Sequence, residues 1–318
     1  MKRTLEDVQS LIGNTPLIKI TYKYQGKIRN AFMKAEWYNM SGSIKDRVAF
    51  SIIRHAYQTG DSKPGQEIAE TTSGNMGLSF CALGAFLGHP VKIFMPVFMS
   101  KERKDLIKLF GGELVFGNSF TELFEVAKAY AETHNVFTPL QFENQFNVQA
   151  HIETTGPEIA RQADEKIKAV VAGVGTGGTL IGLSKFFKGQ DASVKAFAVE
   201  PEQSSLLTYG KSKGKHRIQG LSDEIIPAIY NKEFVDEVIA VDDTDAIAMA
   251  QKISKQLGLP VGISGGANFL GCVLSGEDNT ASVFADDNKK YLSTDLANVV
   301  STPLVDSIEF LKIQTFRG

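Results

Sequence analysis

The chain has 318 residues, more than one hydrophobic core usually serves, so we expect two lobes or domains. Its composition, 43% hydrophobic and 22% charged, is that of a globular protein, and a net charge of −2 gives no reason to expect a nucleic-acid or membrane-surface partner. The first residues lack the apolar run of a signal peptide, and no apolar stretch is long enough to cross a bilayer. The two cysteines are far apart in the sequence, which suits a reducing cytoplasm, and the histidines and cysteines show no metal-ligand spacing.

Strand-like apolar runs alternate with helix-like segments along the chain. This alternation predicts an α/β fold, with parallel sheets covered by helices on both faces. The predicted strands are residues 31–35, 67–70, 91–95, 113–116, 169–173, 194–199, 234–241 and 281–285. The predicted helices are residues 44–57, 78–87, 101–110, 121–132, 157–166, 180–187 and 244–257, and an amphipathic helix after Pro303.

The first of these helices carries an unusual cation. Ser43 and Asp46 fit a capping box, and apolar residues recur at helical spacing after Ile44. Lys45 therefore falls in the first turn, where free N–H groups and the macrodipole disfavour a cation by about 0.3–1 kcal/mol. The same field favours the neutral amine, which is a nucleophile, so Lys45 is a candidate catalytic residue. A lysine that simply points into solvent is the alternative.

Four glycine-rich turns lie beside the predicted strands and helices, at residues 71–77, 173–179, 220–223 and 262–267. In open α/β sheets, ligands bind at the carboxyl ends of strands, where the following helix begins. We therefore expect the ligands of this protein at these turns.

The turn at residues 173–179 reads Gly-Val-Gly-Thr-Gly-Gly-Thr between a buried strand and a helix. Its glycines let successive backbone N–H groups converge, which predicts an anion site, with phosphate as the expected anion. It also contains a G-x-G-x-x-G match, and Glu200 lies 22 positions after Gly178 (200 − 178). NAD, another phosphate ligand and a tight structural turn all remain open here. The mid-chain position and the unexplained Lys45 count against NAD.

The turn at residues 71–77 is a second candidate binding site. Thr72, Ser73 and Asn75 offer side-chain donors beside the free N–H groups of a helix start. Such a turn would hold a carboxylate, and a well-capped helix is the alternative. A lysine able to form a Schiff base, a phosphate site and a carboxylate site together describe pyridoxal phosphate holding an amino acid.

A series of motifs, taken in order, resembles the cysteine synthase (O-acetylserine sulfhydrylase) and cystathionine β-synthase family of pyridoxal-phosphate enzymes. The resemblance runs from Ile-Gly-Asn-Thr-Pro-Leu at 12–17 to Lys-Tyr-Leu-Ser-Thr at 290–294. Its pieces include Ser-Ile-Lys-Asp-Arg at 43–47, Thr-Ser-Gly-Asn at 72–75, Gln-Phe-Glu-Asn at 141–144, Thr-Thr-Gly-Pro-Glu at 154–158, Gly-Thr-Gly-Gly-Thr at 175–179, Gly-Ile-Ser at 262–264 and Asp-Asn-Lys-Lys-Tyr at 287–291.

The resemblance implies a two-lobed, three-layer αβα fold with mostly parallel twisted sheets, like that of the tryptophan synthase β subunit. Residues 1–38 and 145–318 would form the larger, cofactor-binding domain. Residues 39–144 would form a smaller mobile domain that closes over the substrate and excludes water. Residues 297–318 would be a C-terminal extension. A cytoplasmic homodimer that acts on a small amino acid is expected, with no nucleic-acid, membrane or metal partner.

The resemblance also implies roles for matching residues. Lys45 would carry pyridoxal 5'-phosphate as a Schiff base and then act as the base at Cα. Asn75 would bond the ring oxygen, and Ser264 would meet the pyridine nitrogen. Because a hydroxyl does not keep that nitrogen protonated as a carboxylate would, the ring is a weaker electron sink, which favours β-elimination and β-replacement through an aminoacrylate over transamination. Gly175, Thr176, Gly177, Gly178 and Thr179 would hold the phosphate, and Thr72, Ser73, Asn75, Met76 and Gln141 would surround the substrate.

The sequence departs from the family's pattern at three places. The substrate motif of cysteine synthases usually ends in threonine, where this chain has the apolar and adaptable Met76. Gly265 replaces a serine. The loop usually written Gly-Ile-Gly-Ala-Gly-Phe-Ile-Pro reads Gly-Leu-Ser-Asp-Glu-Ile-Ile-Pro at 220–227, which also resembles the B-type cysteine synthases. Asp223 or Glu224 could therefore orient or deprotonate water or a thiol, and a solvated loop edge is the alternative.

The first expectation for function is therefore cysteine synthase-like β-replacement, with an O-activated serine and sulfide or another thiol as substrates. The alternative within the class is a cysteine lyase, or a β-replacement on cysteine, that releases hydrogen sulfide and gives serine, with Asp223 activating water. The alternatives from other classes are an NAD-binding oxidoreductase and a regulatory protein that binds the cofactor without turnover.

Overall fold

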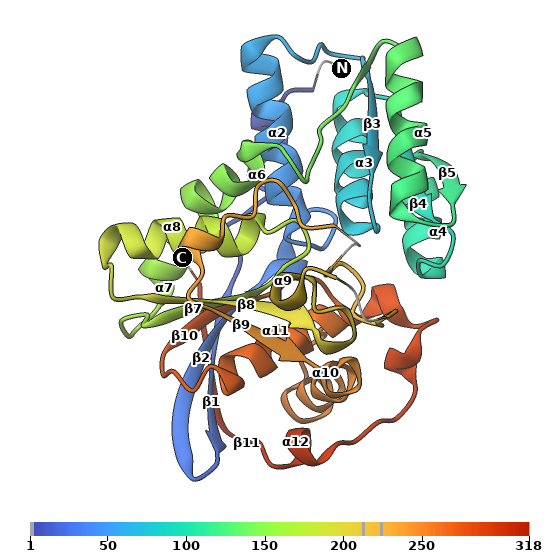
Figure 1. The fold of residues 1–318 in the computed structure, drawn as a ribbon. Helices are drawn as coiled ribbons and strands as arrows, with labels where there is room; N and C mark the ends of the chain where they lie inside the picture. The colour runs from blue at the N-terminus through green and yellow to red at the C-terminus, as the bar shows by residue number, and fades with distance from the viewer. Residues whose placement is uncertain (1–2, 212–213, 223–224, 318) are drawn as a thin grey trace.

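Figure 1 shows the computed structural model of the protein, which describes residues 3–211, 214–222 and 225–317. Within these residues the strands form a seven-stranded sheet, in the order β11-β1-β2-β10-β7-β8-β9, and a four-stranded sheet, in the order β5-β4-β3-β6. Strand β1 is antiparallel to both of its neighbours, and the other pairs are parallel. The predicted α/β class with mostly parallel sheets is confirmed. The domain boundaries at residues 39 and 144 stay a prediction.

Every predicted strand is present, and three further strands were not predicted, namely β1, β6 and β11. The seven-stranded sheet contains β1 (Leu17–Tyr24), β2 (Lys27–Ala35), β7 (Ala169–Gly173), β8 (Lys195–Pro201), β9 (Glu237–Val241), β10 (Thr280–Phe284) and β11 (Glu309–Phe316). The four-stranded sheet contains β3 (Glu67–Thr71), β4 (Val91–Pro96), β5 (Glu113–Gly117) and β6 (Val136–Phe137).

The predicted helices are present within a few residues of their expected ends, except for the last one. The helices are α1 (Leu5–Gln9), α2 (Lys45–Thr59), α3 (Asn75–Leu87), α4 (Lys101–Leu109), α5 (Phe120–Thr133), α6 (Gln145–Ala150), α7 (Gly156–Gln162), α8 (Gly178–Gln190), α9 (Leu206–Tyr209), α10 (Asp243–Leu257), α11 (Ile263–Leu274) and α12 (Pro303–Asp306). No helix in the described part of the chain is long and apolar enough to cross a membrane.

Helices cover both faces of both sheets, and successive side chains along a single strand pack into different cores. In β7, Val171 packs into the core beneath α10 and α11, whereas Val170 and Ala172 pack into the core beneath α8. In the four-stranded sheet, Ile93 of β4 faces α2 and α3, and Phe94 faces α5. Successive side chains of a strand point to opposite faces, so strands buried on both sides are apolar throughout. This is the three-layer arrangement.

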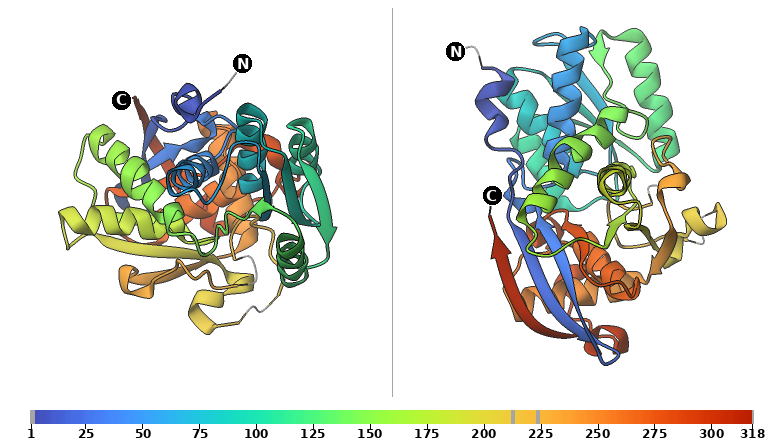
Figure 2. Two further views of the ribbon diagram at one scale, coloured as in Figure 1. Left: turned by 90° about the horizontal axis from the view of Figure 1, so that it is seen from above. Right: turned by 90° about the vertical axis from the view of Figure 1, so that its left-hand side faces the viewer.

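The expected amphipathic helix after Pro303 is wrong. Helix α12 ends after one turn at Asp306, and residues 309–316 form β11, which pairs with β1 in antiparallel register. The right-hand view of Figure 2 shows β11 in red beside the blue strands β1 and β2. The open edge of β1 offers unpaired N–H and C=O groups, and pairing with them outweighs the helical spacing of the apolar residues.

Candidate active site

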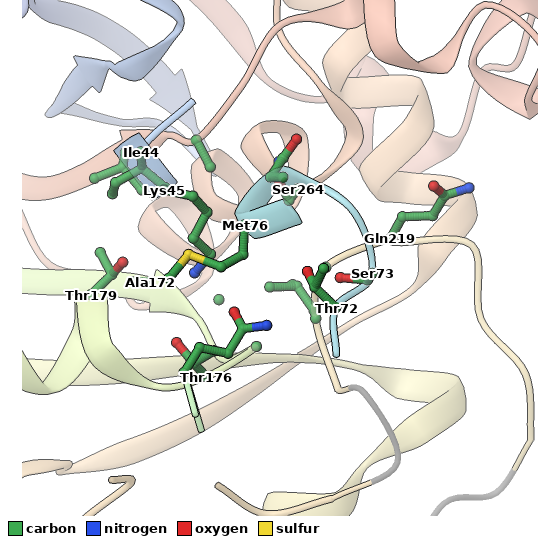
Figure 3. Close-up of a pocket in the computed structure, with 18 of the residues that line it drawn as sticks. Ile44, Lys45, Thr72, Ser73, Met76, Ala172, Thr176, Thr179, Gln219 and Ser264 are labelled. Atoms are coloured by element: carbon green, nitrogen blue, oxygen red, sulfur yellow. The ribbon is translucent and has the colours of Figure 1, made fainter. Parts of the chain in front are cut away.

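Residues from all four glycine-rich turns line one pocket between the two sheets (Figure 3). The carboxyl ends of β3 and β7 approach each other there, as the α/β rule predicts. Gly178 does not line the pocket itself but lies between two residues that do. Asp223 lies outside the described residues. The predicted site residues that line the pocket are Lys45, Thr72, Ser73, Asn75, Met76, Gln141, Gly175, Thr176, Gly177, Thr179 and Ser264.

Lys45 is the first residue of α2 and faces the pocket (Figure 3). The capping box predicted for this helix start is wrong. Ile44 occupies the cap position, and the Asp46 carboxylate accepts from the backbone N–H and the hydroxyl of Ser41 instead. Burial raises the pKa of Asp46, and the hydrogen bonds from Ser41 oppose that shift. The buried aspartate therefore fixes the loop that precedes Lys45 rather than capping the helix.

The turn at residues 173–179 brings backbone N–H groups to the start of α8. A Cβ at position 175 would lie 2.2 Å from the carbonyl oxygen of Gly220, and one at position 178 would lie 2.0 Å from Oδ1 of Asn147. Real Cβ atoms do not approach so closely, so glycine is required at both positions. The first N–H groups of a helix have no partner within the helix, and together with the macrodipole they attract an anion. The turn therefore fits a phosphate group.

Two hydroxyls complete this anion site. Asn147 donates through Nδ2 to Oγ1 of Thr176 at 2.9 Å, and Nε2 of His151 lies 3.3 Å from Oγ1 of Thr179. His151 is fully buried in a π-helical turn, His151–Thr155, a rare element that is frequent at functional sites. Burial, followed by the positive charges of Lys45 and Arg47, holds the pKa of His151 well below its usual range. A neutral His151 can thus orient the Thr179 hydroxyl.

The turn at residues 71–77 has a different set of supports. Gln141 donates through Nε2 to the carbonyl oxygen of Thr71 at 3.0 Å, and the backbone N–H of Gly74 donates to Oγ1 of Thr72 at 3.1 Å. Glu70, at the end of β3, is buried, and its desolvation raises its pKa to about 8. The hydroxyls of Thr72 and Ser73 lie at the start of α3, where a carboxylate would be bound.

Asn75 supplies the observation that tests the site for a ring ligand. Its Nδ2 donates to Oδ2 of Asp286 at 2.8 Å. Its Oδ1 is buried and has no hydrogen-bond partner among the described residues. Buried polar groups are almost always satisfied, so an unsatisfied oxygen on a pocket-lining residue marks a place for a ligand. The phosphate-fitting turn, Lys45 and Ser264 lie on the same pocket, so the residues present fit pyridoxal phosphate.

Sequence reasoning missed Arg103, Gln219 and Asn268, which also line the pocket. Arg103 is buried in the first turn of α4, and its guanidinium bonds Gln219. A cation in a first turn is the signal that pointed to Lys45, so the same signal was available for Arg103. Gln219 directly precedes one of the glycine-rich turns. Asn268 lies inside α11 and accepts from the N–H of Gly173 at 2.7 Å, and no sequence signal indicates it.

A larger cavity of about 660 Å³ adjoins the pocket and shares Gln219 and Gly220 with it. Apolar side chains such as Phe98 and Phe120 line one part of it, and His216 and Arg217 line another. The bond between Arg103 and Gln219 lies at the boundary between the two spaces.

Comparison with known proteins agrees with this geometry. The family model of pyridoxal-phosphate dependent enzymes matches residues 8–286. A cysteine synthase from Staphylococcus aureus is 36% identical over 304 residues, which cover 93% of this chain and 98% of that protein. A hydrogen sulfide-producing enzyme from Fusobacterium nucleatum is 41% identical, covers 99% of both chains and gives a TM-score of 0.94. An aspartate-to-asparagine variant of such an enzyme, complexed with an α-aminoacrylate intermediate, gives a TM-score of 0.96.

The two sheets, the glycine-rich turn and the lysine in the pocket fit the class of α/β enzymes that bind pyridoxal phosphate. The chain belongs to the pyridoxal-phosphate dependent enzyme family. It is an enzyme of the β-replacement and lyase class, and pyridoxal phosphate is its cofactor. The resemblance described from the sequence motifs is thereby confirmed.

Proposed function

We propose that the enzyme acts on L-cysteine, releases hydrogen sulfide and forms serine by β-replacement with water. The observation that carries the proposal is the likeness to a hydrogen sulfide-producing enzyme, at 41% identity over 99% of both chains. The departures at Met76 and at residues 222–224 from the cysteine synthase pattern point the same way. In the reaction the Cβ–S bond breaks and a Cβ–O bond forms with the oxygen of water. One proton of water stays on the new serine hydroxyl and the other passes to the departing HS⁻, which gives hydrogen sulfide, so the atoms balance.

The substrate carboxylate would be held at the start of α3. Thr72 and Ser73 would donate through their hydroxyls, with the first-turn N–H groups beside them, and Gln141 would donate through its amide. Met76 is buried and lines the same space (Figure 3). An apolar side chain at this position suits the thiol-bearing Cβ of cysteine better than the ester oxygen of an O-activated serine.

Lys45 would move the proton at Cα. Bound pyridoxal phosphate supplies the electron withdrawal that makes this proton removable. The Lys45 amine would take the proton as general base and return it after the nucleophile has added to Cβ. Residues 175–179 would hold the phosphate, Asn75 the ring oxygen and Ser264 the ring nitrogen, so the chain fixes the cofactor at both ends around Lys45.

Asp223 remains the proposed activator of water, and it lies outside the described residues. The residues before it support the idea. Gly220 and Leu221 line the pocket, and Ser222 is buried at φ 51°, with its hydroxyl donating to the carbonyl oxygen of Ser204 at 3.0 Å. The variant of the hydrogen sulfide-producing enzyme that carries the aminoacrylate has lost an aspartate, as expected if an aspartate helps to consume that intermediate.

The second candidate function is cysteine synthesis from an O-activated serine and sulfide. Cysteine synthases at 36% identity over 93% of this chain support it. The deciding experiment gives the purified holoenzyme cysteine alone, and in a separate assay O-acetylserine with sulfide, and compares kcat/KM for the two. Sulfide and serine in equal amounts from cysteine, with the larger kcat/KM, are expected. Faster cysteine formation from O-acetylserine would replace the first proposal with the second.

Two matched variants test the water step. Asp223→Asn should lower serine formation from cysteine by about 10²-fold, because it removes a general base while keeping the side-chain size. Glu224→Gln, the same change one residue later, should leave the rate within about twofold of wild type. Unchanged serine formation in Asp223→Asn would remove Asp223 from the mechanism without touching the roles proposed for Lys45 and the pocket.

The resemblance also supports a cytoplasmic homodimer and closure of residues 39–144 over the substrate. Size-exclusion chromatography with light scattering would measure the mass, and twice 34.7 kDa is expected. Small-angle scattering with and without a non-reacting amino acid would measure closure, for which a smaller radius of gyration with ligand is expected. A monomer, or an unchanged radius, would contradict the respective expectation.

A further inference from the structure

Asp286 follows β10 and is completely buried beside the pocket. Its Oδ2 accepts from Nδ2 of Asn75 and from the hydroxyl of Tyr291, both at 2.8 Å, and Nη2 of Arg103 lies 3.5 Å away. Ala285, the residue before it, lines the pocket, whereas Asp286 does not. Asp286 therefore does not reach a ligand directly but contacts three side chains around it.

The chemistry of Asp286 determines how Asn75 is oriented. The oxygens of a carboxylate accept hydrogen bonds, and the end of the Asn75 amide that faces Asp286 is the NH₂ group. The amide oxygen is then at the other end, where it is buried and has no partner among the described residues. Turning the amide over would bring its oxygen against a carboxylate oxygen and leave two acceptors facing each other. One orientation is thus strongly favoured.

The surroundings hold Asp286 in this role. Arg103 is buried, and its guanidinium lies 4.4 Å from the centre of the Tyr291 ring, so a positive charge and a hydroxyl donor flank the same carboxylate oxygen. On the other side, a Cβ at position 262 would lie 2.1 Å from Oδ1 of Asp286. Oδ2 is therefore bonded, whereas Oδ1 has no hydrogen-bond partner among the described residues and is packed against Gly262, so the carboxylate has little freedom to turn away from Asn75.

We propose that Asp286 is a positioning residue, which fixes the Asn75 carboxamide so that its Oδ1 and its second Nδ2 hydrogen are presented to the cofactor. The inference deepens the proposed function, since it rests on the contact proposed between Asn75 and the ring oxygen. The hydrogen bond to that oxygen affects the electronic state of the cofactor ring. Asp286 thus influences the ring through Asn75 without touching it.

The test compares two variants of the holoenzyme. Asp286→Asn replaces the acceptor-only carboxylate by an amide that tolerates either orientation of Asn75. Tyr291→Phe is the matched control, because it removes one donor to the same oxygen but keeps the carboxylate and its bond to Asn75. Visible absorption at fixed pH, and the dissociation constant for pyridoxal phosphate added to the apoenzyme, are measured for each, with the thermal midpoint as a check on folding.

Asp286→Asn should shift the visible absorption maximum and raise the cofactor dissociation constant by about tenfold, the loss expected for one charge-assisted hydrogen bond. Tyr291→Phe should keep the wild-type spectrum even where its thermal midpoint falls. Asn75→Ala should show the altered spectrum by itself, and adding Asp286→Asn to it should cause no further shift, since the two residues act as one unit.

A wild-type spectrum and cofactor affinity in Asp286→Asn would overturn the inference, and so would a second spectral shift in the double variant. If Asp286→Asn does not fold, Asp286→Glu keeps the charge but displaces the carboxylate by one methylene, and an unchanged spectrum there would overturn the inference equally. A wild-type protein that binds pyridoxal phosphate but is inactive on cysteine would contradict the proposed substrate and leave this test valid. One that binds no pyridoxal phosphate would overturn both.

Discussion

The two strand–turn–helix units that form the site, residues 71–77 and 173–179, have the same local design but different supports. The turn at residues 173–179 is closely packed, with Gly175 against the backbone of Gly220 and Gly178 against Asn147, and it is also hydrogen-bonded to Asn147 and Asn268. In the turn at residues 71–77, Gly74 packs against the flexible side chain of Arg103, and polar contacts to Gln141 on one side and Asp286 on the other hold the turn in place. Packing against backbone gives a permanent shape, suited to a cofactor that stays bound. Polar contacts can break and form again, which suits a substrate that enters and leaves.

Lys45, where the two units meet, gives the largest expected effect. Lys45→Ala should lower turnover by about 10²–10⁴-fold, because it removes the base at Cα, and it should leave the circular dichroism spectrum unchanged. Borohydride reduction followed by peptide mapping of the wild-type protein should place the cofactor label on this residue. Full activity in Lys45→Ala would refute the role proposed for it.

The close packing of the turn at residues 173–179 can be tested by adding a methyl group to one of its glycines. Gly178→Ala places a Cβ against Oδ1 of Asn147, so it should destabilise the protein by about 1–3 kcal/mol and weaken cofactor binding. Gly189→Ala is the control in the same helix, where a Cβ would meet nothing within 4 Å and should be neutral or stabilise by about 0.5–1 kcal/mol. Denaturant unfolding measures both. Equal effects would show that the close contact at Gly178 is unimportant.

The surroundings of the turn at residues 71–77 can be tested by the pH dependence of stability, because the buried, titratable Glu70 directly precedes the turn. The folded protein raises the pKa of Glu70 to about 8 from 4.5, mainly through burial. Between these values the folded state holds a proton that the unfolded state has released, so the stability due to this group falls as pH rises from 4.5 to about 8. Glu70→Gln should remove that fall and stabilise the protein at pH 8 by about 1 kcal/mol. Denaturant unfolding at several pH values would show a parallel decline in both proteins if Glu70 is not responsible.

The smallest expected effect comes from one hydroxyl of the polar turn. Ser73→Ala should raise KM for the amino acid by about fivefold, the value of one neutral hydrogen bond, and leave the cofactor dissociation constant unchanged. Thr176→Ala, on the packed turn, should do the reverse. Steady-state kinetics and cofactor titration separate the two results. A change of both constants in either variant would mean that the two turns do not act separately.

Much of the fold and of the pocket was predictable from local pattern. Glycine-rich turns after apolar strands predicted where ligands bind, and the position of Lys45 in the first turn of a helix predicted its role. Both predictions were possible because each depends on only a few consecutive residues. Asp286 and Arg103 were not predicted, since their importance depends on which distant side chains they meet. An amphipathic helix was predicted after Pro303 because the apolar residues Leu304, Val305, Ile308 and Leu311 lie at helical spacing, whereas the open edge of β1 selects a strand from residue 309 on.

The pairing of β1 with β11 also has a consequence for synthesis of the protein. Strand β1 at residues 17–24 pairs with β11 at residues 309–316, and β2 pairs with β10 at residues 280–284. These two strands near the N-terminus therefore cannot complete their pairing until almost the whole chain has been synthesised. Contacts so distant in sequence slow folding and leave apolar strands exposed meanwhile. The four-stranded sheet needs only residues 67–137. On the ribosome it can form early, while the sheet that carries the cofactor turn is completed last.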